Sequence, residues 1–169
     1  MIQLKNAKEL AAMRKACEIS AQALRRGGEA IEAGITTAEI DKIIYEYIKR
    51  QGARPNFKGL YGFPGTACIS VNDEVIHGIP SHAKVIRPGD IVSIDTGAAW
   101  GGFNGDNACT FGCGKLDLEA QRLLDVTRES LHRGIAAAVF GARVGDISNA
   151  VQTYVEENGF SVVRSFVGH

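Results

Sequence analysis

Two aspartates, Asp95 and Asp106, have the residue type and the spacing that metal chemistry needs. The apolar segment 91–94 leads into Asp95, and the pair Gly101-Gly102 separates two runs that are compatible with β-strands. A diglycine between two such runs is typical of an antiparallel hairpin closed by a two-residue turn. We therefore predict that the two aspartates lie on the two strands of one hairpin.

The register of this hairpin decides whether the two carboxylates face each other. If the diglycine forms the turn, Trp100 pairs with Phe103, and Gly97 pairs with Asp106. Side chains alternate between the faces of a strand, so Asp95 shares the face of Gly97 and of Asp106. The two aspartates are then diagonal cross-strand neighbours, with Cβ atoms up to ~7–8 Å apart.

Two carboxylates on one largely apolar face repel each other unless a positive charge lies between them. A divalent cation, or a pair of cations ~3.5–4 Å apart, would fit between them. A second interpretation is equally compatible with the spacing: Asp95 ends a strand, and Asp106 belongs to an Asn-Gly-Asp turn. A change of register by one residue would also separate the two side chains.

The overall composition indicates the class of protein. The chain has 169 residues, enough for one domain with a proper core. Lys and Arg number 19, as do Asp and Glu, so no overall charge favours nucleic acid or an anionic membrane. No signal peptide or membrane span is expected. The four cysteines lack zinc or disulfide spacing, which favours free thiols and a cytoplasmic protein.

Helical periodicity and capping signals predict the elements around the hairpin. Helices are expected over 6–26 and 118–140, from the capping box at Thr36 to Gly52, and from Asp146 to Gly159. Extended segments are expected over 68–71, 75–80 and 160–167, with an aromatic and glycine-rich loop over 54–65.

An internal repeat appears when the chain is shifted along itself by 107 positions. Residues 24–52 then match residues 131–159 without gaps, with eight identities in 29 positions. The two copies share one pattern of helices and glycines, which supports a common architecture. We expect a single α+β domain with a first repeat over about 7–113 and a partial second repeat over about 117–169.

Several motifs together resemble the type I methionine aminopeptidases. They are Phe57-Lys58-Gly59, Gly62-Phe63-Pro64, Ser70-Val71-Asn72, segment 75–80, segment 89–95, Asn104-Gly105-Asp106 and Val167-Gly168-His169. The resemblance covers nearly the whole chain in the order and spacing of the family. It implies the pita-bread fold, a pseudo-two-fold α/β arrangement that agrees with the repeat.

The resemblance also implies roles for individual residues. Asp95, Asp106 and His169 would be metal ligands, Asp106 bridging two ions, and His77 would be a catalytic histidine that contacts the substrate. Without the resemblance, His77 would be assigned to a turn. The residues implied in the methionine pocket are His77, Phe57, Leu60, Phe63 and Cys68. Asn104 stands where the family usually has histidine, and no change in the metal ligands is expected from it.

The expected function is removal of the initiator methionine from nascent polypeptides at the ribosome, acting on N-terminal methionyl peptides. The expected cofactors are divalent ions (Co, Mn, Fe or Zn), up to two in the complete family. The family continues to another histidine and two glutamate ligands, so we expect a C-terminally truncated form with weak or single-metal binding and little activity. A further expected partner is a second copy of the chain, in a homodimer through the exposed truncated face.

Two alternatives remain. From a different class, the chain is a non-catalytic module of the same fold that binds peptides or partners. Within the enzymes, the runner-up is an aminopeptidase P or prolidase, from which segments 59–64 and 75–80 point away.

Overall fold

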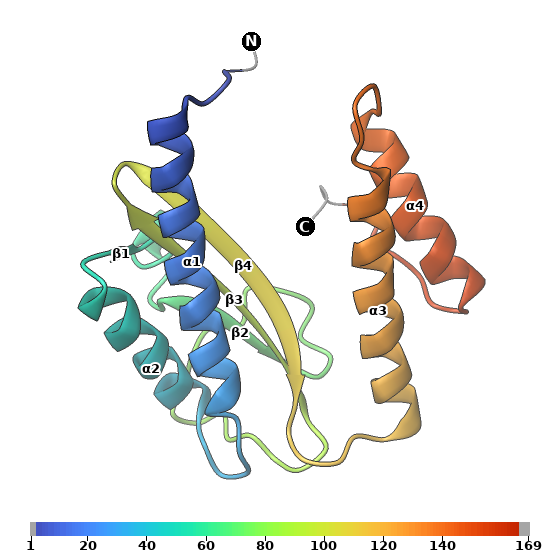
Figure 1. The fold of residues 1–169 in the computed structure, drawn as a ribbon. Helices are drawn as coiled ribbons and strands as arrows, with labels where there is room; N and C mark the ends of the chain where they lie inside the picture. The colour runs from blue at the N-terminus through green and yellow to red at the C-terminus, as the bar shows by residue number, and fades with distance from the viewer. Residues whose placement is uncertain (1–2, 166–169) are drawn as a thin grey trace. The chain divides into compact units, whose positions relative to one another are not determined.

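The computed structural model describes residues 3–165 and divides into two compact units, Met1–Leu116 and Asp117–His169. Figure 1 labels their helices and strands. Unit 1 contains helices α1 (Ala7–Glu29) and α2 (Thr37–Arg50) and strands β1 (Arg54–Pro55), β2 (Ala67–Val71), β3 (Ile91–Trp100) and β4 (Phe103–Gly112). Unit 2 contains α3 (Leu118–Ala137) and α4 (Val144–Glu157).

The sheet of unit 1 is built around the β3–β4 hairpin, which has the predicted register. Trp100 pairs with Phe103, and Gly97 pairs with Asp106. Gly101 and Gly102 form the turn with φ values of 59° and 83°, in the left-handed region that suits glycine. The other edge of β3 pairs with both β2 and β1, in antiparallel fashion.

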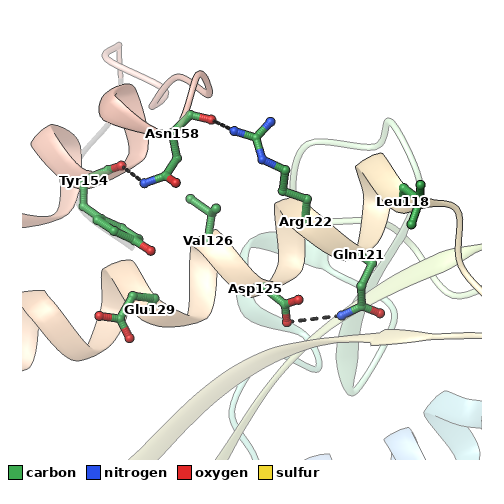
Figure 2. Close-up of a pocket in the computed structure, with 8 residues that line it drawn as sticks. All are labelled: Leu118, Gln121, Arg122, Asp125, Val126, Glu129, Tyr154 and Asn158. Carbon is green, nitrogen blue, oxygen red and sulfur yellow. Dashed lines mark hydrogen bonds between the residues drawn. The ribbon is translucent and has the colours of Figure 1, made fainter.

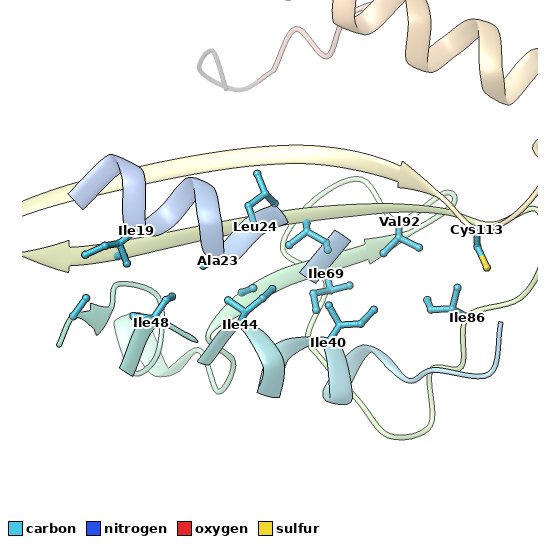
Figure 3. Close-up of a cluster of buried hydrophobic side chains, with 14 residues drawn as sticks. Ile19, Ala23, Leu24, Ile40, Ile44, Ile48, Ile69, Ile86, Val92 and Cys113 are labelled. Atoms are coloured by element: carbon cyan, nitrogen blue, oxygen red, sulfur yellow. The ribbon is translucent and has the colours of Figure 1, made fainter. Parts of the chain in front are cut away.

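Both helices of unit 1 cover the same face of this sheet. Helix α1 packs on β3 and β4, and α2 packs on β1 and β2. Figure 3 shows the apolar cluster that the helices and strands enclose, and its fully buried members include Ile40, Ile44, Ile69 and Ile94. The opposite face of the sheet carries Asp95 and Asp106, and we call it the site face.

The start of α2 follows the predicted capping signal, whereas α4 starts at Val144, two residues before the predicted Asp146. Glu39 N–H donates to Thr36 Oγ1 at 3.2 Å, and Thr36 N–H donates to the Glu39 carboxylate at 2.9 Å. This capping box starts α2 as expected. Helix α1 has an equivalent box between Asn6 and Glu9.

Unit 2 repeats the helix pair of unit 1. The bounds of α2, shifted by 107 residues, coincide with the bounds of α4. A Cβ atom at Gly27 would lie 2.7 Å from Ile44, and one at the equivalent Gly134 would lie 2.8 Å from Val151. The helices therefore approach closely at the same glycine in both copies.

A cation–π contact is repeated in the same way. The Arg26 guanidinium lies 5.1 Å from the ring centroid of Tyr47, and the Arg133 guanidinium lies 3.9 Å from that of Tyr154. Both tyrosines therefore belong to the packing of the repeat. The assignment of the whole chain to a single domain stays a prediction.

Two predicted extended segments differ from the structure. Segment 75–80 is not a strand: it follows a turn at Asn72 and touches β2 through the 2.8 Å bond from Ile69 N–H to the Gly78 carbonyl. Residues 160–165 do not form a strand either, because a strand needs a pairing edge and the elements described in residues 117–165 are the helices α3 and α4. Residues 166 and 167 of the predicted segment lie outside the described residues.

Candidate metal and substrate site

The hairpin places Asp95 and Asp106 on the site face at diagonal positions. Asp95 pairs with Ala108, Asp106 pairs with Gly97, and both aspartates lie inside strands. Neither aspartate therefore ends a strand or belongs to a turn, which answers the second interpretation of the spacing. Asp95 is half-buried and Asp106 is exposed.

Cys68 lies directly opposite Asp95 on β2. Burial is the largest cause, and the negative charges of Asp95, Asp106 and Asp41 act in the same direction; together they raise the pKa of the Cys68 thiol from 9.0 to about 11. The two site carboxylates therefore act on the same buried thiol, which places a negative potential on the site face.

Phe57 covers the site face beside the two aspartates. A Cβ atom at Gly97 would lie 3.2 Å from Phe57 Cε1 and 3.0 Å from Asn56 Nδ2, so glycine at position 97 leaves room for both side chains. Because Gly97 pairs with Asp106, the Phe57 ring lies next to the carboxylate pair. The structure thus brings Phe57 and Cys68 together with Asp95 and Asp106.

Leu60 and Phe63 lie on the same loop as Phe57. A short 3-10 helix over Leu60–Gly62 closes this loop, with Leu60 N–H bonded to the Phe57 carbonyl at 2.9 Å and Gly59 N–H bonded to the Phe63 carbonyl at 2.8 Å. Leu60 is 52% exposed, and Phe63 is half-buried. These bonds tie Leu60 to Phe57, which covers the sheet, and Phe63 to Gly59 of the same loop.

His77 is exposed and has a φ of 59°, an uncommon conformation for a residue other than glycine. The following residue, Gly78, donates its N–H to Ser70 Oγ at 3.0 Å. A Cβ atom at Gly78 would lie 2.2 Å from the Ile69 carbonyl oxygen, so the loop rests directly on β2. Ser70 and Cys68 lie on the same face of β2, so the bond from Gly78 to Ser70 attaches the loop of His77 to the site face.

The predicted ligand His169 lies outside the described residues. Within residues 3–165, no three His, Cys, Asp or Glu side chains are arranged to hold a metal ion. The donor set that the described part supplies is the carboxylate pair of Asp95 and Asp106. Carboxylate oxygens on one face fit a divalent cation such as Mn²⁺ or Zn²⁺, and they leave the remaining ligands to other groups.

Unit 2 has an open groove of its own. Figure 2 shows it between α3 and α4, next to Arg122 and Asn158. Its carboxylates already have partners, because Asp125 pairs with Arg128 and Glu129 pairs with Arg133. Among the predicted site residues that the structure describes, none lines this groove.

Asp41 was missed by the sequence analysis. Its Oδ1 accepts the N–H groups of Thr66 and Ala67 at 2.7 Å and 2.8 Å, just before Cys68. The sequence carries a weak signal for it, an acidic residue one turn after Thr37 on an otherwise apolar helix flank.

Comparisons with known proteins identify the family of the chain. The model of metallopeptidase family M24 matches residues 11–169. Methionine aminopeptidase of Clostridium perfringens is 52% identical over the whole chain, which spans 68% of that relative, and methionine aminopeptidase 1 of Bacillus subtilis is 47% identical with the same coverage.

The crystal structure of methionine aminopeptidase from Thermotoga maritima superimposes with a TM-score of 0.96 at 41% identity. It covers 100% of this chain, and the chain covers 68% of it. The expected pita-bread fold is confirmed, and the second half of it is incomplete in the present chain. The chain belongs to metallopeptidase family M24, in its methionine aminopeptidase branch.

Proposed function

We propose that this chain carries the first carboxylate ligands and the substrate pocket of a metal-dependent aminopeptidase that removes the initiator methionine from nascent polypeptides. The observation that carries the proposal is the pair Asp95 and Asp106 on one sheet face, next to Phe57 and Cys68. The relatives named methionine aminopeptidase support it.

The residues of the chain would divide the work. Asp95 and Asp106 would hold a divalent cation, with His169 as a further ligand. The chemistry that such a cation supplies when bound is Lewis-acid activation of water and of the scissile carbonyl. His77 would donate a hydrogen bond to the substrate as negative charge develops on it.

The methionine side chain would bind in the pocket of Phe57, Leu60, Phe63 and Cys68. Aromatic rings and a protonated thiol are apolar and polarizable, and they suit a thioether. Because a hydrophobic pocket discriminates by only ~1–3 kcal/mol per methylene, the pocket must be firmly held in place to select methionine. The proposed partners are N-terminal methionyl peptides and nascent chains.

The alternative is a module of the same fold that binds peptides without hydrolysing them. The carboxylate pair favours the enzyme, because two carboxylates on one sheet face are donors of the kind that a catalytic divalent cation needs. None of the helices in residues 3–165 has the length and hydropathy needed to cross a bilayer.

Calorimetric titration of Mn²⁺ into EDTA-treated protein, followed by an assay of methionine release from a Met-Ala-Ser peptide, tests the proposal. We expect weak binding that disappears in Asp106→Asn and persists in Asp73→Asn, a matched change at an exposed turn. Release of methionine that disappears in Asp106→Asn would exclude the peptide-binding module. Absence of binding, or binding unaffected by Asp106→Asn, would refute the proposed metal site.

A further inference from the structure

One flank of α2 holds the loops that border the site face. Thr37, Asp41 and Tyr45 follow each other at intervals of four residues, so they lie along one stripe of the helix. We call these three residues the anchor stripe. It runs beside the buried face of α2, which is made of Ile40, Ile44 and Ile48. Each member of the stripe contacts a different part of the loops.

Asp41 holds the start of β2. Its Oδ1 accepts two backbone N–H groups, from Thr66 at 2.7 Å and from Ala67 at 2.8 Å. A carboxylate that accepts such bonds forms stronger hydrogen bonds than a neutral acceptor. Cys68 is the next residue along the chain, so these two bonds fix the strand end that places Cys68 opposite Asp95.

Tyr45 holds the other end of the same loop. Lys58 Nζ lies 4.5 Å from the centroid of the Tyr45 ring, a cation–π contact. Lys58 directly follows Phe57, the residue that covers Gly97 on the site face. Asp41 and Tyr45 therefore tether segment 58–66 at both ends, and this segment carries Leu60 and Phe63.

Thr37 holds the loop that follows His77. Its Oγ1 accepts the N–H of Ser81 at 2.9 Å and donates to the Ser81 carbonyl at 3.2 Å. The Thr37 N–H donates to the Lys84 carbonyl at 3.0 Å. Both loops that border the site face are thus attached to one helix flank.

Comparison with the second copy of the repeat shows that the anchor stripe is not needed for the packing of the helix pair. The close glycine contact and the cation–π contact occur in both copies. The counterparts of the anchor stripe are different residues: Val144, Ser148 and Gln152. Ser148 and Gln152 bond within their own helix, to the Val144 carbonyl and to Glu156. The helix pair therefore packs without an anchor stripe.

We infer that Asp41 is a positioning residue for the substrate pocket, acting through its bonds to Thr66 and Ala67 on the loop of Phe63 and on Cys68. The inference rests on the proposed function for the meaning of the pocket. The attachment of the loop itself is measurable in the metal-free chain without substrate. The two ideas can therefore fail separately.

The test compares Asp41→Ala, Asp41→Asn and the control Ser148→Ala in the full 169-residue chain. Asparagine keeps an oxygen that can accept both N–H groups, whereas alanine removes it. We measure amide hydrogen exchange by residue, and iodoacetamide labelling of Cys68 by mass spectrometry, with the exposed Cys17 as internal reference.

In Asp41→Ala, exchange at residues 66–68 should rise at least about tenfold, because two buried N–H groups lose their acceptor. Labelling of Cys68 should accelerate relative to Cys17, while exchange in the β3–β4 hairpin stays within about twofold of the wild type. Asp41→Asn should restore most of the protection, and Ser148→Ala should resemble the wild type.

Three results would overturn the inference. Unchanged exchange at 66–68 in Asp41→Ala would show that these bonds do not hold the loop. A uniform rise across unit 1 would show a global loss of stability. Failure of Asp41→Asn to restore protection would show that the acceptor oxygen is not what matters. If wild-type protein binds no Mn²⁺ while the local effect is seen, the proposed function fails and the positioning role stands.

Discussion

Replacement of Gly105 by alanine should destabilise unit 1 because α1 lies directly on this residue. Gly105 is buried on the helix-covered face of β4. A Cβ atom there would lie 2.4 Å from the Ala16 carbonyl oxygen and 2.5 Å from Cys17 Cα. Both are backbone atoms, so a rotamer change cannot relieve the overlap. Ordinary van der Waals contact begins near 3.4 Å, and α1 must therefore retreat by about 1 Å.

The cost follows from the contacts that this retreat weakens. Ile19 and Ala23 of α1 are fully buried, and a gap of about 1 Å forfeits up to about half of their packing energy, roughly 1–2 kcal/mol together. The 2.8 Å bond from Ser20 Oγ to the Thr96 carbonyl contributes about 1 kcal/mol more. Alanine loses less backbone entropy than glycine on folding, which offsets about 0.5–1 kcal/mol of this cost. The net loss is about 2 kcal/mol.

Urea unfolding followed by the fluorescence of Trp100, the single tryptophan, measures this loss in unit 1. Gly145→Ala is the matched control, because a Cβ atom there has nothing within 4 Å and the residue lies in α4. We expect the control to leave the Trp100 transition in place. A loss below about 0.5 kcal/mol in Gly105→Ala, at an unchanged m-value, would refute the close approach of α1 to β4.

Two further predictions concern titration. In EDTA-treated protein, the pH profile of Cys68 alkylation should give a pKa of about 11, raised from 9.0 by burial and then by the charges of Asp95 and Asp106. The substitution Asp106→Asn should lower this pKa, because it removes one of the negative charges. A midpoint near 9 in the wild type would contradict the buried position of Cys68 beside the carboxylates. Burial raises the pKa of Asp41 above 3.8 against the opposing bonds from Ala67 and Thr66, so the folded state holds this proton more tightly than the unfolded state. The contribution of Asp41 to the free energy of unfolding should therefore fall as the pH rises from 3.8 through the folded pKa. In urea titrations at a series of pH values, Asp41→Asn should remove this part of the pH dependence. An unchanged pH profile in Asp41→Asn would contradict burial as the cause of the raised pKa.

The hairpin shows how much of the site was predictable. The diglycine turn and the alternation of side chains are local rules, and they gave the correct pairing of Gly97 with Asp106. The capping box at Thr36 and the repeat of helices are local in the same sense. Segment 75–80 was predicted as an extended segment, and in the structure it forms no strand. Its local sequence cannot reveal that its backbone bonds to β2 are those around Gly78.

The sequence by itself determined the start of α2, the repeat and the hairpin register, and the register gives Asp95 and Asp106 their shared face. Each of these features depends on residues close in the chain or on a periodic pattern. Only the tertiary structure decided that Phe57 lies over Gly97, that α1 lies on Gly105, and that Asp41 holds the start of β2. These contacts join residues 25 or more positions apart, and their partners are selected by how helices and loops pack on the sheet.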